Sequence, residues 1–214
     1  MALAKLKSDA TEARLADVVI PHGAAWSNAV RADALARVRQ MGLPTKRDEY
    51  WKYTDPASLT TGETPHAAIF QNDEGPLFDA VDRVRIVFVD GVFDAAASDD
   101  LSAEGVEIAR LSDAMAMDIH WVKDLYGVLE TRGQTPVHRP LAALNTALAK
   151  DGVVIRVTAK VSKPINLIYL HKDESSDVIL HNVVKVEAGA EVTLLETGPA
   201  AARFSKQLEV EVAD

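Results

Sequence analysis

Residues 151–170 have the sequence DGVVIRVTAKVSKPINLIYL, and this stretch decides the fold. After the turn-forming pair Asp151-Gly152, apolar residues occupy every second position from Val153 to Val161. Side chains two positions apart share one face of a β-strand, so this period predicts a half-buried strand. Further strands are predicted at residues 165–170, 178–186, 192–195 and 208–212. Their starts lie roughly a dozen residues apart, which leaves no room for helices and favours a β-sandwich, a barrel or a β-solenoid.

The chain before residue 151 is predicted to be mainly helical. Residues 4–17 are rich in good helix formers, and a second helix is predicted from a cap near Ser27 to Met41. Gly42 and Pro44 then form a strong stop. The apolar face predicted for the second helix consists of Trp26, Val30, Ala34, Val38 and Met41. Its arginines Arg31, Arg37 and Arg39 are expected on other faces.

The rest of this first part combines one strand with two more helices. Val84–Val89 is a short apolar run before the turn Asp90-Gly91, which indicates a strand. Residues 115–129 are predicted to form a helix, and so is the segment with the apolar stripe Leu141, Leu144 and Leu148. Residues 97–111 support no assignment. The predicted fold class is therefore α+β, with a mainly helical region at residues 1–150 and an all-β region at residues 151–214.

Composition and charge narrow the range of functions. The 214 residues contain no cysteine, which excludes disulfides, thiolate nucleophiles and Cys-ligated zinc or iron–sulfur centres held by this chain alone. The net charge is −9, and residues 51–110 carry 12 acidic but only 4 basic side chains. Nucleic acid is therefore not an expected partner. No apolar run is long enough to span a bilayer, and no secretory signal is present, so we expect a cytoplasmic protein without membrane contact.

Motifs for catalysis and cofactor binding are missing from the sequence. It contains no phosphate-binding loop, dinucleotide fingerprint, nucleophile elbow or zinc-binding HExxH helix. His171 and His181 lie on successive predicted strands and could bind a divalent metal together with Asp173, although two turn or surface histidines are the preferred interpretation. The acidic pairs Asp73-Glu74 and Asp99-Asp100 match no calcium loop and are interpreted as solvated turns.

The most unusual local composition is the octapeptide RDEYWKYT at residues 47–54. Aromatic residues interleaved with Arg and Lys can stack on nucleic-acid bases, but the acidic stretch that follows argues against this role. The preferred interpretation is a small satellite core, with Trp51 and Tyr53 buried beneath a loop. The motif residues Arg47, Glu49, Trp51, Lys52, Tyr53 and Thr54 are therefore assigned a structural role, and no catalytic, cofactor-binding or metal-binding residue is predicted.

The octapeptide resembles the R-x-E-x-W-K-Y-T stretch near the N-terminus of the SufD family. Four later segments agree with the family in the same order: VFVDGVF at 87–93, LNTALAKDG at 144–152, PINLIYL at 164–170 and VEAGAEVTLLE at 186–196. The W-K-Y-T piece is the most specific of them, and the resemblance runs from about Trp26 to the end of the chain.

This resemblance implies a non-catalytic scaffold subunit of an iron–sulfur cluster assembly complex. The family has a helical N-terminal region, a central right-handed parallel β-helix and a C-terminal helical region, so residues 151–214 are expected to begin the β-helix. A SufB-like paralogue and a SufC-like ATPase are the implied partners, with ATP hydrolysis assigned to SufC. Since family members continue well past residue 214, most of those contacts are expected beyond this chain.

Other functions stay open at this point. The turn-then-strand run at residues 187–192 is also typical of a cupin-type domain that binds a small molecule or a metal, although the several inward histidines of such a site are not evident. A third hypothesis is an enzyme with an unrecognised carboxylate pair. No cofactor is expected on this chain alone, and the sequence does not determine flavin binding by the parent complex.

Overall fold

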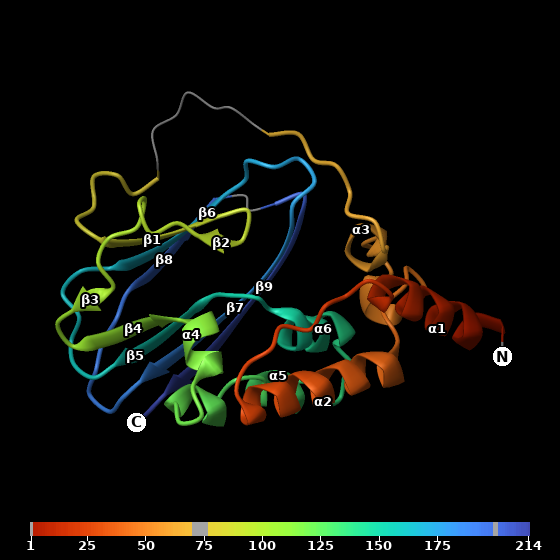
Figure 1. Cartoon of the computed structure of the whole chain (residues 1–214), viewed down its shortest axis with the longest axis horizontal. Helices are drawn as coiled ribbons and strands as arrows, with labels where there is room; N and C mark the ends of the chain where they lie inside the picture. Colours follow the sequence, from red (N-terminus) through yellow and green to blue (C-terminus); the bar gives the residue numbers. More distant parts are fainter. Residues whose placement is uncertain (1, 70–76, 199–200) are drawn as a thin grey trace.

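The computed structural model describes residues 2–69, 77–198 and 201–214 (Figure 1). The α-helices are α1 (Ala2–Leu15), α2 (Ala25–Met41), α3 (Ala57–Thr60), α4 (Leu111–Ala116), α5 (Val128–Arg132) and α6 (Pro140–Leu148). Two 3₁₀-helices are η1 (Glu49–Trp51) and η2 (Trp121–Asp124). The strands are β1 (Val84–Val89), β2 (Val92–Phe93), β3 (Ser102–Ala103), β4 (Val106–Arg110), β5 (Val153–Val157), β6 (Ile165–Leu170), β7 (Asp177–Val186), β8 (Leu194–Thr197) and β9 (Arg203–Val212).

The strands form two sheets that lie one above the other (Figure 1), with one apolar cluster between them. The first sheet has the order β2-β1-β6-β8, and the second has the order β3-β4-β5-β7-β9. From β5 onward, successive strands alternate between the sheets, and each pairs in parallel with the strand two places along the chain. The longest of these ladders joins β7 to β9, from Asp177 opposite Arg203 to Val186 opposite Val212.

The α+β prediction is confirmed, whereas the finer prediction of a β-helix is not. The β1–β2, β3–β4 and β4–β5 pairs are antiparallel, so both sheets are mixed, and the described residues do not form a regular solenoid. Strands that precede residue 151 also enter both sheets, since β1 pairs with β6 and β4 pairs with β5. Each sheet thus takes strands from both sides of residue 151, and the division there into two domains stays a prediction.

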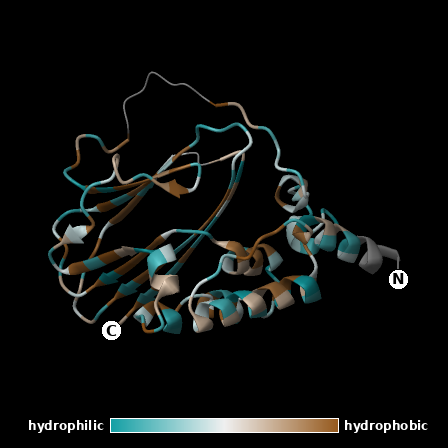
Figure 2. Cartoon of the chain, in the orientation of Figure 1, coloured by the Kyte–Doolittle hydropathy of each residue, from teal (hydrophilic) through white to brown (hydrophobic). Residues whose placement is uncertain are grey.

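Aliphatic and aromatic side chains fill the space between the sheets. The hydropathy colouring shows hydrophobic positions along the strands of both sheets (Figure 2). Phe88 of β1 stacks on Tyr169 of β6 with ring centroids 6.1 Å apart, and Ile155 and Leu180 face them from the second sheet. All four side chains are at least 96% buried. Because such burial gives about 25 cal/mol per Å² of apolar surface, this interior is the main source of stability for the β part.

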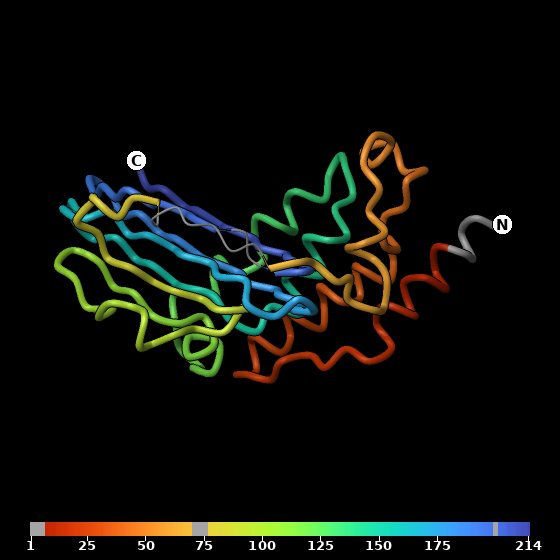
Figure 3. Tube along the Cα trace, turned by 90° about the horizontal axis from the view of Figure 1, so that it is seen from above, coloured from red at the N-terminus to blue at the C-terminus, as the bar shows by residue number. Residues whose placement is uncertain are grey.

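The helices gather against the other face of the second sheet (Figures 1 and 3). Helix α6 packs between α2 and strands β7 and β9, through Ala143, Leu144 and Ala147. Helix α4 and the turn after it cover β5 and β7, where Val154 and Val183 are buried among Leu111 and Val122. The middle of the second sheet is therefore covered on both faces. None of the helices in the described part of the chain combines the length and apolar character required to cross a membrane.

Two local predictions about α2 were wrong. Ser27 lies inside this helix rather than at its cap, and its buried hydroxyl donates to the carbonyl oxygens of Ala24 and Met115, both 2.9 Å away. Arg31 lies on the buried face together with Ala34 and Val38, instead of on another face, and only 2% of the residue is exposed. Its guanidinium donates to the Ala147 carbonyl oxygen at 3.3 Å, so the helix interface satisfies part of its hydrogen-bonding capacity. The predicted stop at Gly42 is confirmed, since Gly42 has a φ of 66° and its N–H donates to the Val38 oxygen.

The helix predicted over residues 115–129 is broken into short pieces. Helix α4 ends at Ala116, η2 supplies one 3₁₀ turn, and α5 begins only at Val128. Gly127 precedes α5 in the left-handed conformation, with a φ of 74°, which interrupts helical geometry. Between β4 and β5 the chain therefore makes a compact helical excursion, and α5 stands beside the C-terminal half of β9.

Candidate functional site

The octapeptide at residues 47–54 forms a tight, surface-facing turn between α2 and α3. Asp48 anchors this turn by accepting hydrogen bonds from the Thr45 N–H at 2.6 Å and from the Lys7 ammonium at 3.1 Å. Burial alone would raise the pKa of Asp48, but the hydrogen bonds from Thr45 and Lys7 outweigh burial and hold the pKa below its usual value. The turn is thereby fastened to helix α1.

The prediction that Trp51 and Tyr53 form a buried satellite core was wrong for Tyr53. Tyr53 is 90% exposed and Tyr50 is 73% exposed, while Trp51 is half-buried. The Lys52 ammonium lies 5.3 Å from the centroid of the Tyr53 ring, which is a cation–π distance on the surface. The remaining motif residues Arg47, Glu49 and Thr54 are also exposed. Most of the motif therefore faces solvent, and its structural role stays a prediction that rests on Trp51.

Two hollows flank Trp51, with volumes of about 280 Å³ and 260 Å³. Their opposite walls come from the segment that leads into α6, which includes His138 and Pro140. The larger hollow shares Arg139 with a bigger cleft that runs along β9. The motif thus lies at the margin of the cleft along β9.

The histidines considered as metal ligands lie apart and have different environments. His171 follows β6 and its Nε2 contacts the Asp173 carbonyl oxygen at 2.8 Å, whereas His181 is fully buried in β7 beside the helices. Within residues 2–69, 77–198 and 201–214, no three His, Asp or Glu side chains gather closely enough to hold a metal ion. The described part of the chain therefore offers no support for the metal-binding cupin alternative. Of the acidic pairs, Asp99 forms an ion pair with Arg85 at 2.7 Å, and Asp73-Glu74 lies outside the described residues.

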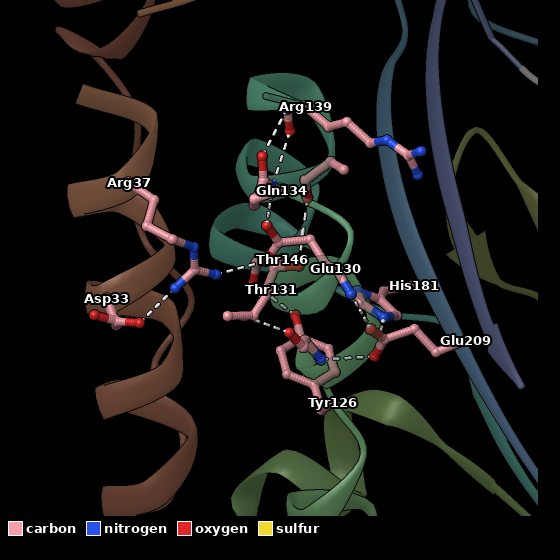
Figure 4. A network of polar contacts seen from close by, with 12 residues as sticks. Asp33, Arg37, Tyr126, Glu130, Thr131, Gln134, Arg139, Thr146, His181 and Glu209 are labelled. Atoms are coloured by element: carbon pink, nitrogen blue, oxygen red, sulfur yellow. Dashed lines mark hydrogen bonds and ion pairs between the residues drawn. The ribbon is translucent and has the colours of Figure 1, made fainter. Parts of the chain in front are cut away.

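A buried polar network connects β7 and β9 with the helices (Figure 4). The Glu209 carboxylate is 3% exposed and lies 3.1 Å from Nε2 of His181, a residue with no exposed surface. It also accepts the N–H groups of Gly127 at 2.6 Å and of Glu130 at 3.0 Å, at the start of α5. One carboxylate thus holds a strand, a histidine and a helix start in fixed relative positions.

Tyr126 completes this network on its other side. Its ring lies 4.3 Å from the imidazole of His181, and its hydroxyl donates to the Thr146 carbonyl oxygen at 2.7 Å. Burial raises the pKa of the Tyr126 phenol far above its ordinary value, so the phenol stays protonated as a hydrogen-bond donor. The Arg31 guanidinium lies 6.0 Å from the ring centroid and supplies a cation–π contact.

Glu130 extends the network to the outer helix α2. Its side chain is fully buried and pairs with Arg37 at 2.5 Å (Figure 4). Because a buried carboxylate without a partner costs several kcal/mol, Arg37 fixes α2 against α5. Each of the two carboxylates in this network, Glu130 and Glu209, has its own partner, which is typical of a network that holds elements of a fold together.

A cleft between β9 and helices α5 and α6 has a volume of about 530 Å³. Leu129, Leu141 and Ile179 contribute to its apolar lining. Its polar lining includes Arg14, Arg139, Asn145, Asp177 and Arg203. A concave site with apolar walls and a few polar groups is typical of small-molecule binding sites, and the volume falls in their usual range.

The sequence did not identify most of these residues. Arg31, Glu130 and Glu209 are charged residues that helical or strand periodicity assigns to solvent, and they are buried here because each meets a partner from a distant segment. Asn145 carries no local signal at all. The sequence does not show that such a charged residue is buried, because its partner can be far away along the chain. Glu209 and its partner Gly127, for example, are 82 positions apart.

Comparison with known proteins agrees with this architecture. Residues 76–167 match the family described as SufBD protein N-terminal region; the match spans β1 to the first half of β6 and includes Tyr126, Gly127 and Glu130 of the network. The chain is also similar to the iron–sulfur cluster assembly protein SufD of Escherichia coli (strain K12), with 24% identity over 169 residues. That match covers 76% of this chain and 37% of the E. coli protein.

Proposed function

We propose that this chain is part of a non-catalytic scaffold subunit that works in iron–sulfur cluster assembly. The observation that carries the proposal is the family match at residues 76–167, together with the similarity to SufD over 76% of the chain. In this proposal the protein acts in the cytoplasm, in a complex with a SufB-like paralogue and a SufC-like ATPase. The chain covers 37% of the SufD relative, so most contacts with these partners are assigned to segments outside residues 1–214.

The strand order supports the further proposal that β5–β9 belong to a right-handed parallel β-helix. In such a fold each turn of the chain places one strand in each sheet, on top of the strand from the turn before. The alternation of β5, β7 and β9 in one sheet with β6 and β8 in the other has this property. Among the described strands, β8 and β9 are the outermost members of their sheets, and Val210 and Val212 of β9 are 40% and 66% exposed. We propose that further strands of a β-helix cover this end.

The absence of catalytic chemistry on this chain is part of the same proposal. Its sequence has no cysteine to hold a cluster and no glycine-rich phosphate-binding loop, so ATP hydrolysis is assigned to the SufC-like partner. The buried carboxylates described above have structural partners, which agrees with a scaffold. We assign no cofactor to this chain alone.

A gene-deletion experiment tests the role in cluster assembly. Cells without the gene for this protein should lose activity of a [4Fe–4S] enzyme such as aconitase under iron limitation, and a plasmid copy should restore it. As a control, an enzyme that lacks iron–sulfur clusters should keep its activity. Normal aconitase activity after iron limitation would overturn the proposal.

A binding experiment tests the assignment of the partner contacts. Protein tagged at its N-terminus and expressed from its own gene should co-purify with the SufB-like and SufC-like proteins, whereas residues 1–214 alone should not bind purified SufC-like protein in a calorimetric titration. A micromolar affinity for residues 1–214 would move the ATPase contact into this chain. Failure of the gene product to retain either partner would contradict membership of the complex.

A further inference from the structure

At one end of the cleft beside β9, positively charged side chains outnumber negatively charged ones. Arg14 of α1 and Arg203 of β9 are 7% and 4% exposed, and both contact the same carboxylate, that of Asp177. Two buried guanidiniums therefore share one negative charge. A buried cation without a full counter-charge is unfavourable, because the low dielectric of the interior does not replace its hydration.

Most of the hydrogen-bonding capacity of the Arg203 guanidinium is used within the chain. It donates two hydrogen bonds to Asp177, at 2.9 and 2.6 Å, and its Nη1 donates to the carbonyl oxygen of Thr61 at 2.8 Å. These bonds tie the segment before β1 to the sheet. Arg203 thus has a complete structural role, and Asp177 is largely committed to it.

Arg14 makes fewer hydrogen bonds than Arg203. A guanidinium has five N–H groups, and in the described structure Arg14 makes one hydrogen bond, from Nη2 to Asp177 at 3.1 Å. Its buried Nε has no acceptor. Burial, followed by repulsion from Arg203, lowers the pKa of Arg14, which shows that the surroundings do not compensate its charge.

The other ionic groups along the cleft do not supply the missing negative charge. Glu130 pairs with Arg37, and Glu209 pairs with His181 and with backbone N–H groups. Lys206 pairs with Glu196 at 2.5 Å. Arg139 is exposed at the rim, and no ion pair involves it within the described part of the chain.

Asn145 provides a second unsatisfied group in the same cleft. The residue is 2% exposed, and its side-chain nitrogen donates to the carbonyl oxygens of Leu180 at 3.0 Å and Ser205 at 3.2 Å. Its Oδ1 has no donor. Buried polar groups of native proteins are normally paired, so the lining of this cleft contains two groups, Nε of Arg14 and Oδ1 of Asn145, whose hydrogen-bonding capacity the described chain does not use.

We propose that this cleft binds a small ligand that carries one anionic group, a phosphate or a carboxylate, on an apolar body. Arg14 and Arg139 bind the anionic group, since guanidinium N–H groups match the oxygens of both kinds of anion. The apolar body packs against Leu141 and Ile179, close to the side chain of Asn145 in the lining of the cleft. This site is independent of the proposed scaffold function and needs no partner protein.

The test uses residues 1–214 and four probes: phenyl phosphate, benzoate, inorganic phosphate and benzyl alcohol. Isothermal titration calorimetry should show saturable binding of phenyl phosphate or benzoate, and the stronger of the two identifies the preferred anion. Benzyl alcohol, which lacks the charge, should bind at least tenfold more weakly. Inorganic phosphate should also bind at least tenfold more weakly than phenyl phosphate, because it has no apolar body.

Variants locate the site and distinguish it from general charge attraction. R14Q and R139Q should each weaken binding of the preferred probe at least tenfold, whereas R39Q should not change it. Arg39 is a matched control because it is 50% exposed on α2 and lies outside the cleft. R139Q removes an exposed side chain, so it keeps the test valid even where R14Q disturbs folding.

Chemical shifts give an independent readout. The side-chain amide of Asn145 should shift on titration with the preferred probe, in proportion to its saturation. Binding that is equal in R14Q, R139Q and R39Q would overturn the proposal. The same conclusion would follow if neither anion binds better than benzyl alcohol, or if the Asn145 amide does not shift.

Discussion

The substitution Glu209→Gln tests the buried network most directly. The carboxylate accepts three hydrogen bonds, from Nε2 of His181 and from the N–H groups of Gly127 and Glu130. Glutamine has nearly the same shape but offers one oxygen and places an NH₂ group where the second oxygen was. At least one of the three buried donors therefore loses its acceptor.

The expected magnitude follows from this count. A buried donor left without an acceptor costs about 1–3 kcal/mol, and the remaining bonds lose the assistance of the negative charge, which is worth about 1 kcal/mol more. We therefore expect E209Q to lower the free energy of unfolding by about 2–4 kcal/mol at pH 7. E211Q is the matched control, because Glu211 lies on the same strand, is 49% exposed and has only a long contact of 3.9 Å with Lys185. It should change stability by less than about 0.5 kcal/mol.

The effect should also depend on pH in a defined direction. Burial alone would raise the pKa of Glu209, but the hydrogen bond and charge of His181 and the two backbone N–H groups outweigh burial, so its pKa is lowered in the folded chain. The unfolded state then binds more protons, and stability from this group increases with pH. The contribution is complete above the unfolded pKa of about 4.3 and is lost as the pH falls through the lower folded value.

Urea denaturation of wild type, E209Q and E211Q, followed by tryptophan fluorescence, measures both effects. The difference between wild type and E209Q should be largest at pH 7 and should shrink below a pH of about 4.3, with unchanged m-values. A difference of the same size at pH 7 and at pH 3.5 would refute the argument that the charge of Glu209 matters. A difference below about 0.5 kcal/mol at pH 7 would refute its structural role.

Three further predictions concern the octapeptide at residues 47–54, the residue Gly152 and the absence of an iron–sulfur cluster on the purified chain. Trp51→Ala should cost about 1–3 kcal/mol by chemical denaturation, since the ring is half-buried, whereas Tyr53→Ala should stay within about 0.5 kcal/mol; equal costs would show that the two rings have the same role. Gly152→Ala should cost about 2–4 kcal/mol, because Gly152 has a φ of 152° and a Cβ there would overlap the His181 carbonyl oxygen; an unchanged unfolding midpoint would contradict this geometry. Purified chain should hold no stoichiometric iron or acid-labile sulfide after anaerobic reconstitution, and a visible cluster absorption band would contradict this.

Six of the nine described strands were predicted from local sequence, four of them to within a residue or two at each end, whereas β2, β3 and β4 were not predicted. The predicted strand at residues 165–170 coincides with β6, and the strand predicted at residues 178–186 begins one residue late. β5 ends at Val157, although apolar alternation continues to Val161. β9 begins at Arg203, five residues before the predicted start, because this end of the strand carries polar side chains whose partners come from other elements: Arg203 bonds to Asp177 of β7, and Ser205 bonds to Asn145 of α6. Its polar character is visible in the sequence, but its partners are not.

The burial of side chains within the second sheet could not be deduced from the two-residue period. Val153 and Ile155 face the first sheet, as the period predicts, but Val154 between them is also buried, with 1% of its surface exposed, among the side chains of α4 and η2. Strands of a sheet that is covered on both faces lose the contrast between an apolar and a polar side. The run of consecutive valines at residues 153 and 154 was the available signal for this arrangement.

In β9, packing against neighbouring elements again decides which side chains are buried, but here a charged residue is buried and an apolar residue is exposed. Leu208, Val210 and Val212 alternate with Glu209 and Glu211, and the period assigns the glutamates to solvent. In the structure Glu209 is 3% exposed while Val210 is 40% exposed, so the charged residue is the more buried of the two. A hydrophobic period identifies which residues share a face, but the packing partner decides which face is covered. Here helix α5 presents two backbone N–H groups that need an acceptor, and only a carboxylate at position 209 supplies it, whereas the valines face the end of the sandwich that we propose a β-helix continues.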